Sequence, residues 1–187
     1  MVRNYTDEPV ARDVVDRIVD AALHSPSAGF SQGQAFVVVR DPEKRRRIAE
    51  LADEAAYIAA GFDPWISHAP VHIVVCVSEE LYRARYREPD KSQNGEEANW
   101  PVPYWWVDAG AAMMLLLLAA VDEGLGAGFL GSHAMGDLAT ELQIPDHMSP
   151  IGVVTIGHAA PDRRSGSLER GRRPRAETVH HEVWVTD

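Results

Sequence analysis

The arginines near the C-terminus are the side chains whose type and spacing point most directly to chemistry. Six of the 18 basic residues fall within 13 positions, although the chain has a formal net charge of -10. A guanidinium group presents a planar fork of N–H donors that binds phosphate oxygens in pairs. This feature alone fits a phosphate site and a solvated basic tail equally well. The residues are Arg163, Arg164, Arg170, Arg172, Arg173 and Arg175.

A polar loop at residues 26–34 is a second candidate for ligand binding. Its sequence, Pro-Ser-Ala-Gly-Phe-Ser-Gln-Gly-Gln, offers hydroxyls, amides and free backbone N–H groups. Taken alone, a plain connection between a helix and a strand is the favoured interpretation.

A glycine-rich stretch at residues 124–131 has the look of a dinucleotide-binding loop. Such a loop follows a strand and opens a helix, whereas these glycines follow an expected helix and precede an expected strand. Gly124 and Gly126 are better interpreted as a helix C-cap and turn. Residues 129–132 can still present backbone groups to a ligand.

Other catalytic patterns are missing from the sequence. It contains no G-x-S-x-G, H-E-x-x-H or P-loop motif, and His180 and His181 are adjacent rather than one helical turn apart. We therefore expect no metal site and no catalytic side chain. A bound cofactor is expected to carry the chemistry.

Composition bounds the class of protein. A chain of 187 residues predicts one domain, and the negative charge argues against a nucleic-acid partner. The single cysteine, Cys76, suits a reducing cytoplasm and predicts a buried, inert thiol. The apolar run 109–121 is shorter than the ~20 residues that span a bilayer, so we expect a core helix and no membrane contact.

The pattern of apolar residues predicts alternating helices and strands. Helices are expected from Pro9 to Ser25, from Asp41 as cap and Pro42 in the first turn to Gly61, from Asp108 as cap or first residue to about Glu123, and over 135–142. Strands are expected over 36–39, 71–77 and 151–156, with a short alternating stretch at 182–185. This predicts an α/β or α+β class with helices packed on a sheet. Residues 78–104 are charged and proline-containing, as in a lid-like or inserted segment.

Together, four stretches resemble the nitroreductase family of FMN-dependent oxidoreductases. Residues 2–5 resemble the end of R-x-S-x-R-x-Y/F, and residues 26–36 resemble P-S-A-x-N-x-Q-P-W-x-F. Residues 124–132 resemble G-L-G-x-x-x-I-G/E-G, and residues 170–184 resemble R/K-x-R-x-P…E-x-V-H…W. The four stretches occur in the order and spacing of the family, and the match spans nearly the whole chain.

The resemblance implies an α+β three-layer fold, with a central, mostly antiparallel sheet flanked by helices. It also implies an intertwined homodimer with FMN at the interface, formed by one domain with a lid at 78–104 and a C-terminal arm at 160–187. NAD(P)H would reduce the FMN and leave, and a nitroaromatic, quinone or related acceptor would then enter the same space.

The resemblance assigns site residues position by position. The phosphate would be bound by Arg3, Arg170 and Arg172, with Arg173 beside them. The partner subunit would supply the loop residues Pro26, Ser27, Ala28, Phe30 and Gln32. Backbone groups at the hydride-accepting edge would come from Phe129, Leu130, Gly131 and Ser132. The substrate slot would be walled by Trp65, Trp100, Tyr104 and Trp105. For Trp100, Tyr104 and Trp105, packing in the core or the dimer interface is the favoured interpretation.

The sequence also departs from the family pattern. Phe30 stands where the motif has asparagine, and Gly33-Gln34 stand where it has Pro-Trp. Phe62 and Trp65 appear where a polar pair often meets the ring. The family's first arginine and its serine have no counterpart in this sequence, which begins at Met1. Either the natural chain starts upstream of Met1, or phosphate binding depends more on Arg170 and Arg172.

Alternatives remain open within and outside the flavin class. A specialised relative would be a dehalogenase, a flavin-fragmenting enzyme or a deazaflavin-binding module. A non-catalytic flavin-binding protein is a further alternative, and a nucleic-acid binder is the least favoured.

Overall fold

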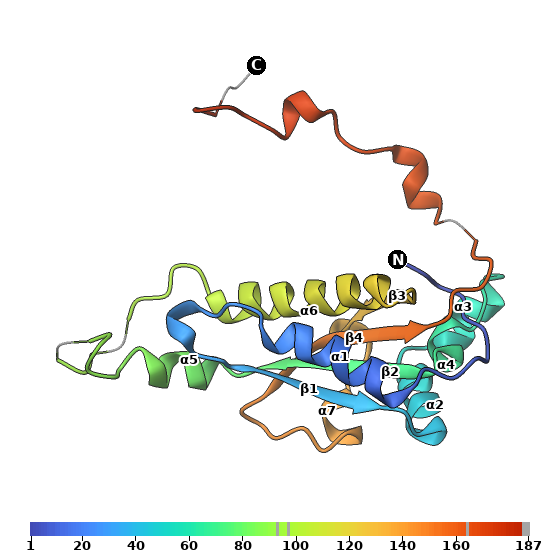
Figure 1. Cartoon of the computed structure of the whole chain (residues 1–187), viewed down its shortest axis with the longest axis horizontal. Helices are drawn as coiled ribbons and strands as arrows, with labels where there is room; N and C mark the ends of the chain where they lie inside the picture. Colours follow the sequence, from blue (N-terminus) through green and yellow to red (C-terminus); the bar gives the residue numbers. More distant parts are fainter. Residues whose placement is uncertain (93, 97, 164, 185–187) are drawn as a thin grey trace.

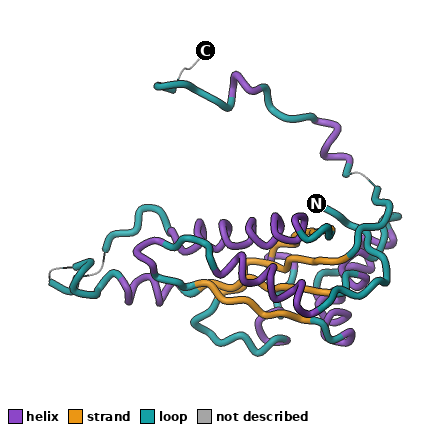
Figure 2. Tube along the Cα trace, viewed as in Figure 1, coloured by secondary structure: helices purple, strands orange, loops and turns teal. Residues whose placement is uncertain are grey.

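The computed structural model describes residues 1–92, 94–96, 98–163 and 165–184, and is built around one antiparallel sheet. Its strands are β1 (Gln34–Val39), β2 (Val71–Val77), β3 (Gly126–Gly131) and β4 (Ser149–Gly157), arranged in the order β1-β2-β4-β3. All three neighbouring pairs are antiparallel. Helices cover both faces (Figures 1 and 2), which confirms the expected three-layer fold.

Strand β2 is the centre of the core. All seven of its residues are buried, because it lies between β1 and β4 and has helices on both sides. Val71, Ile73 and Val75 belong to one apolar cluster, whereas Val74 and Cys76 belong to the cluster on the opposite face. This alternation is the two-residue period of a strand. Burial raises the pKa of the Cys76 thiol to about 11, as expected for an inert cysteine.

One face of the sheet is covered by α1 (Arg12–Leu23) and α6 (Tyr104–Asp122). In α1, Val15, Ile18 and Ala22 recur at helical spacing and are buried. Helix α6 is long and apolar enough to cross a membrane by length and composition alone. Its buried residues instead pack against α1 and the sheet, so we interpret it as a core helix.

The other face is covered by α2 (Pro42–Leu51), α4 (Trp65–His68) and α7 (Leu138–Glu141). Helix α3 (Glu54–Ala59) follows α2, and all of its residues except Glu54 are exposed. The predicted cap is confirmed, since Asp41 Oδ1 accepts a hydrogen bond of 2.9 Å from the Lys44 N–H. The single helix predicted from 42 to 61 is wrong. Asp53 has a left-handed φ of 51°, which ends α2 and starts α3 in a new direction.

Two further predictions need correction. Helix α6 begins at Tyr104 rather than at Asp108. Gly124, with φ of 75°, forms the predicted turn, but Gly126 lies inside β3 because it pairs with Gly157. The segment 78–104 contains α5 (Glu79–Arg85), which Ser78 caps by accepting a hydrogen bond from the Leu81 N–H.

The ends of the predicted elements differ as well. The helix predicted over 135–142 is reduced to α7, and the strand predicted over 151–156 extends to 149–157. Residues 182–183 form bends instead of a strand, and residue 185 lies outside the described part of the chain.

The described residues also form four short 3₁₀ turns: η1 (Ala28–Phe30), η2 (Ser132–Ala134), η3 (Gly166–Arg170) and η4 (Arg175–Glu177). The last two lie in the C-terminal arm predicted from residue 160, of which the structure describes residues 160–163 and 165–184. Figure 1 shows this arm running away from the body. Leu168, Val183 and Trp184 are each more than two-thirds exposed, so the arm buries little apolar surface within its own chain.

Truncation of the core helix tests this packing. Leu116 is fully buried between α1 and the sheet. We expect Leu116→Ala to lower the free energy of unfolding by about 2–5 kcal/mol, because it removes buried methyl groups and leaves a cavity. Leu81→Ala, at a 43% exposed position, is the matched control and should cost far less. Equal losses in urea titrations of the two variants would contradict the assigned core.

Candidate functional site

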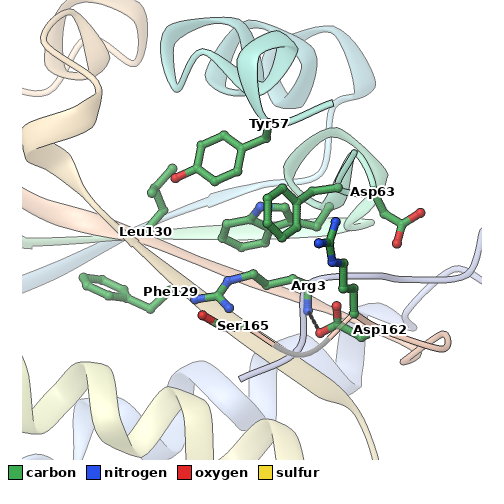
Figure 3. Close-up of a pocket in the computed structure, with 10 residues that line it drawn as sticks. Arg3, Tyr57, Asp63, Phe129, Leu130, Asp162 and Ser165 are labelled. Atoms are coloured by element: carbon green, nitrogen blue, oxygen red, sulfur yellow. Dashed lines mark hydrogen bonds between the residues drawn. The ribbon is translucent and has the colours of Figure 1, made fainter. Parts of the chain in front are cut away.

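A cavity of about 250 Å³ lies beside the edge strand β3. Its walls come from the N-terminal segment, the region of α3 and α4, β3 itself and the root of the arm. Figure 3 shows the Arg3 guanidinium between Phe129 and Ser165. The lining residues are Arg3, Tyr57, Phe62, Asp63, Trp65, Phe129, Leu130, Asp162, Arg163 and Ser165.

The N-terminal segment is fixed along β3, which places Arg3 in the cavity. The Val2 N–H donates to the Ala127 carbonyl at 2.9 Å, and the Arg3 N–H donates to Asp162 Oδ2 at 2.8 Å. Tyr5 is buried, and its hydroxyl lies 2.8 Å from Thr155 Oγ1. Backbone and core contacts therefore hold Arg3, and its side chain remains available to a ligand.

Gly128 is required for this approach. A Cβ atom there would lie 2.6 Å from the Val2 carbonyl oxygen and 3.0 Å from Cζ3 of Trp65. A larger residue would therefore displace both the N-terminal segment and the indole.

Helix α4 carries Trp65, and a buried carboxylate holds the start of that helix. Glu54 is only 5% exposed. Its Oε1 accepts from the N–H of Ile66 at 2.6 Å and of Ser67 at 3.1 Å. A negative group at a helix N-terminus satisfies N–H donors that have no partner inside the helix.

The side chains of Arg45 and His72 donate hydrogen bonds to carbonyl groups within α4 and directly after it. Arg45 Nη1 donates to the carbonyls of Ser67 at 3.1 Å and Ala69 at 2.7 Å. His72 Nε2 donates to the Ile66 carbonyl at 2.7 Å. Together with Glu54, these groups fix Trp65, which is 2% exposed, in the cavity wall. The Trp65 Nε1–H is buried and has no hydrogen-bond acceptor in the described chain.

An aromatic–cation pair covers another side of the cavity. The Arg163 guanidinium lies 4.9 Å from the centroid of the Phe62 ring, and its Nη1 donates to the Gly61 carbonyl at 3.4 Å. Two arginines and two aspartates thus surround an aromatic wall. Such a cavity suits a planar ring that carries an anionic group.

The structure brings four of the predicted site residues together: Arg3, Trp65, Phe129 and Leu130. Gly131 ends β3 and Ser132 begins η2, directly after them in the chain. The prediction missed Tyr57, Asp63, Asp162 and Ser165 as wall residues, and their only signal was proximity in sequence to Phe62 or to the arginine tail. Arg163 was predicted only as one of the tail arginines that could bind phosphate, and the structure places it in the wall.

The loop residues Pro26, Phe30 and Gln32 line a different cavity, together with the end of α1. This loop leads into β1, at the edge of the sheet opposite β3. Three strand spacings separate the two edges, which is about 14 Å. One copy of the chain therefore does not bring the loop to Arg3.

The predicted phosphate-binding arginines of the arm are also apart from the cavity. Arg170, Arg172 and Arg173 are exposed and are not among the residues that line it. Arg173 Nη2 donates to the Glu177 carbonyl at 3.1 Å within the arm. Their role at the phosphate stays a prediction.

The remaining predicted aromatic residues form a separate cluster. Trp100 lies with its ring centroid 5.6 Å from that of Trp105 and 6.4 Å from that of Tyr104. The Trp100 ring also meets Tyr82 and Tyr86 edge-to-face. Trp105 is only 5% exposed, so core packing explains it. Trp100 and Tyr104 line an open cavity beside Ala28, and Trp65 is not part of this cluster.

Comparisons with known proteins agree on one family. The family profile described as "Nitroreductase family" matches residues 1–158. The chain is 32% identical over 192 residues to a protein named FMN reductase [NAD(P)H] from Bacillus subtilis, covering 98% of this chain and 70% of that protein. It is 29% identical over 188 residues to a putative NADH dehydrogenase/NAD(P)H nitroreductase from Methanothermobacter thermautotrophicus, covering 98% and 82%.

Solved structures show the same relationship. The hypothetical oxidoreductase YcnD from Bacillus subtilis aligns with a TM-score of 0.74 and 29% identity, over 99% of this chain and 71% of that one. An NADPH:FMN oxidoreductase from Vibrio harveyi complexed with NAD+ aligns with a TM-score of 0.71 and 21% identity, over 99% and 74%. The second likeness shows the fold alone.

Stability at low pH tests the environment of His72. Burial lowers the pKa of His72 to about 4, whereas an unfolded histidine titrates near 6.5. As pH falls below about 6.5, the unfolded state binds a proton that folded His72 does not take up. Folding should therefore lose up to about 3 kcal/mol between pH 6.5 and 4.

His72→Gln keeps an N–H donor and removes the titration, so it should flatten this part of the stability profile. His147→Gln, at an exposed position, is the control. Urea unfolding at a series of pH values measures the slope. An unchanged slope in His72→Gln would contradict the assigned cause.

Proposed function

This chain belongs to the nitroreductase family, and on that premise we propose that it is an FMN-dependent oxidoreductase that oxidises NAD(P)H and reduces a small acceptor. The observation that carries the proposal is the cavity beside β3, where Arg3 and an aromatic wall meet an edge strand. A nitroaromatic, quinone or related molecule is the proposed acceptor class.

The residues present fit a flavin mononucleotide in three respects. The Arg3 guanidinium is free to bind a phosphate, and Trp65, Phe62 and Phe129 offer apolar surface to a ring. The buried Trp65 Nε1–H also has no acceptor among the residues that the structure describes. Flavin would supply the hydride-accepting centre when bound, so no protein nucleophile is needed.

Backbone groups of β3 are the ones that we propose to orient the flavin ring. An edge strand has a neighbour on one side only, so half of its N–H and C=O groups point away from β4. The N-terminal segment occupies the Ala127 carbonyl. We assign the groups from Phe129 to Gly131, with Ser132 next to them, to hydrogen bonds with the flavin. Fixed N–H donors stabilise charge that develops on a reduced ring.

The cavity of one copy is smaller than a usual ligand pocket of about 300–1,000 Å³. We propose that a second copy completes it in a homodimer. Helix α6 supports this, because one exposed face carries apolar side chains at heptad spacing: Val107, Met114, Leu118 and Val121. The partner would supply residues 26–32, and the arm would bring Arg170, Arg172 and Arg173 to the phosphate.

The same proposal includes a lid over the flavin and a cytoplasmic location. The chain forms one domain with a lid at residues 78–104 and an arm from residue 160. Trp100 and Tyr104 would shape the access of NAD(P)H and acceptor to the flavin. A buried, protonated Cys76 and an acidic surface suit the cytoplasm.

Substitution of the arm arginines tests the phosphate assignment. We expect Arg170→Ala with Arg172→Ala to weaken FMN binding by about a hundredfold, because each lost charge-assisted hydrogen bond costs about tenfold. Fluorescence titration with FMN measures the affinity, and NADH or NADPH oxidation with a nitroaromatic or quinone measures turnover.

Arg12→Ala with Arg46→Ala is the matched control, since it removes two exposed arginines from α1 and α2. Full flavin occupancy in the arm variant would contradict the phosphate assignment. A wild-type protein that binds FMN without oxidising NAD(P)H would contradict the enzymatic proposal.

A further inference from the structure

The loop between α1 and β1, residues 26–33, has a backbone that its sequence does not favour. Gly29 has a φ of 63°, Phe30 of 57° and Gln32 of 49°. The left-handed region is unfavourable for Phe and Gln because of their Cβ atoms. Surrounding contacts must therefore impose this conformation.

Two tyrosines shape the seat of this loop. A Cβ atom on Gly29 would lie 2.6 Å from Cε2 of Tyr86, and one on Gly33 would lie 2.5 Å from Cε2 of Tyr82. Tyr82 belongs to α5 and Tyr86 follows its end. The glycines thus let the backbone lie directly against these rings.

The carboxylate of Asp108 ties the loop to the same seat. Asp108 Oδ2 accepts a hydrogen bond of 2.8 Å from the Ala28 N–H and one of 2.9 Å from the Tyr82 hydroxyl. Burial, and then the bond to Asp108, raises the pKa of Tyr82 well above its usual value, so the hydroxyl remains a donor. One carboxylate therefore links α6, α5 and the loop.

Local hydrogen bonds stiffen the rest of the loop. Ser27 Oγ accepts from the Gln32 N–H at 2.9 Å, and Ser31 Oγ donates to the Ala28 carbonyl at 2.6 Å. At the tip, Phe30 is 73% exposed. The fixed loop therefore presents a large apolar ring at its tip, at the mouth of the cavity that it forms with the end of α1.

We propose that Asp108 is a positioning residue for flavin binding, which fixes residues 26–33 so that Phe30 and the adjacent backbone meet the flavin bound by a second copy. The proposal rests on the proposed function. Asp108 touches neither flavin nor substrate, and acts through the Ala28 N–H and Tyr82.

FMN affinity and the visible circular dichroism of the bound flavin test this role. Asp108→Ala should weaken FMN binding by about tenfold, since it removes a charge-assisted acceptor from the loop. The flavin that still binds should show an altered dichroism, because the loop at its side has moved. A variant that is only less stable would leave the dichroism of bound flavin unchanged.

Conservative variants separate positioning from general damage. Asp108→Asn keeps an acceptor oxygen and should restore FMN affinity to within about threefold of wild type. Tyr82→Phe keeps the ring beside the loop and removes only the hydroxyl that donates to Asp108. It should give an intermediate loss of FMN affinity. Asp122→Ala, an exposed aspartate on the same helix, is the matched control and should bind normally.

The outcomes distinguish this proposal from the proposed function. If wild type binds FMN and Asp108→Ala binds it with equal affinity and dichroism, the positioning role is overturned alone. The same holds if Asp108→Asn binds as poorly as Asp108→Ala. If wild type binds no FMN, the proposed function fails. If Asp108→Ala does not fold, the Asp108→Asn and Tyr82→Phe variants test the positioning role in its place. A Tyr82→Phe variant with wild-type FMN affinity and dichroism would then overturn that role.

Discussion

The strand order β1-β2-β4-β3 is the constraint on which the rest of the structure depends. The buried strand β2 pairs with β1 on one side and β4 on the other, so β1 and β3 are forced to opposite edges. The loop before β1 and the cavity beside β3 are therefore separated by the width of the sheet. A ligand that needs both must be shared between two copies, and the exposed face of α6 and the outstretched arm fit that requirement.

Carboxylates that accept backbone N–H groups fix the geometry in both halves of the proposed site: Glu54 is buried, and Asp108 is partly buried. Glu54 holds the start of α4 and so fixes Trp65 in the cavity wall. Asp108 holds the loop before β1 in the same manner, by accepting a backbone N–H. Glu54 does not line the cavity itself, and Asp108 bonds the loop two residues before its tip at Phe30. Unpaired polar groups in such places would be costly, so these contacts define one conformation rather than several.

Local sequence patterns predicted the elements whose formation depends mainly on residues that are neighbours in the sequence. The β-branched run 71–77 matches β2 residue for residue, and Asp41 caps α2 as expected. The break at Asp53 was not predictable from apolar spacing, because that spacing continues through it. Asp108 looked like a helix cap, and only the tertiary fold shows that it instead serves the backbone of Ala28, 80 residues away. The resemblance to a family located Arg3 and Phe129, but the walls at Tyr57 and Asp162 depend on chain packing.

Native mass spectrometry of the purified protein tests the central claim most directly, because it reports mass and bound flavin together. A site shared between copies predicts a dimer that carries two FMN molecules, and loss of both flavins when the dimer is separated into single chains. A single chain that retains FMN, or a dimer that takes up none when FMN is added, would contradict the account.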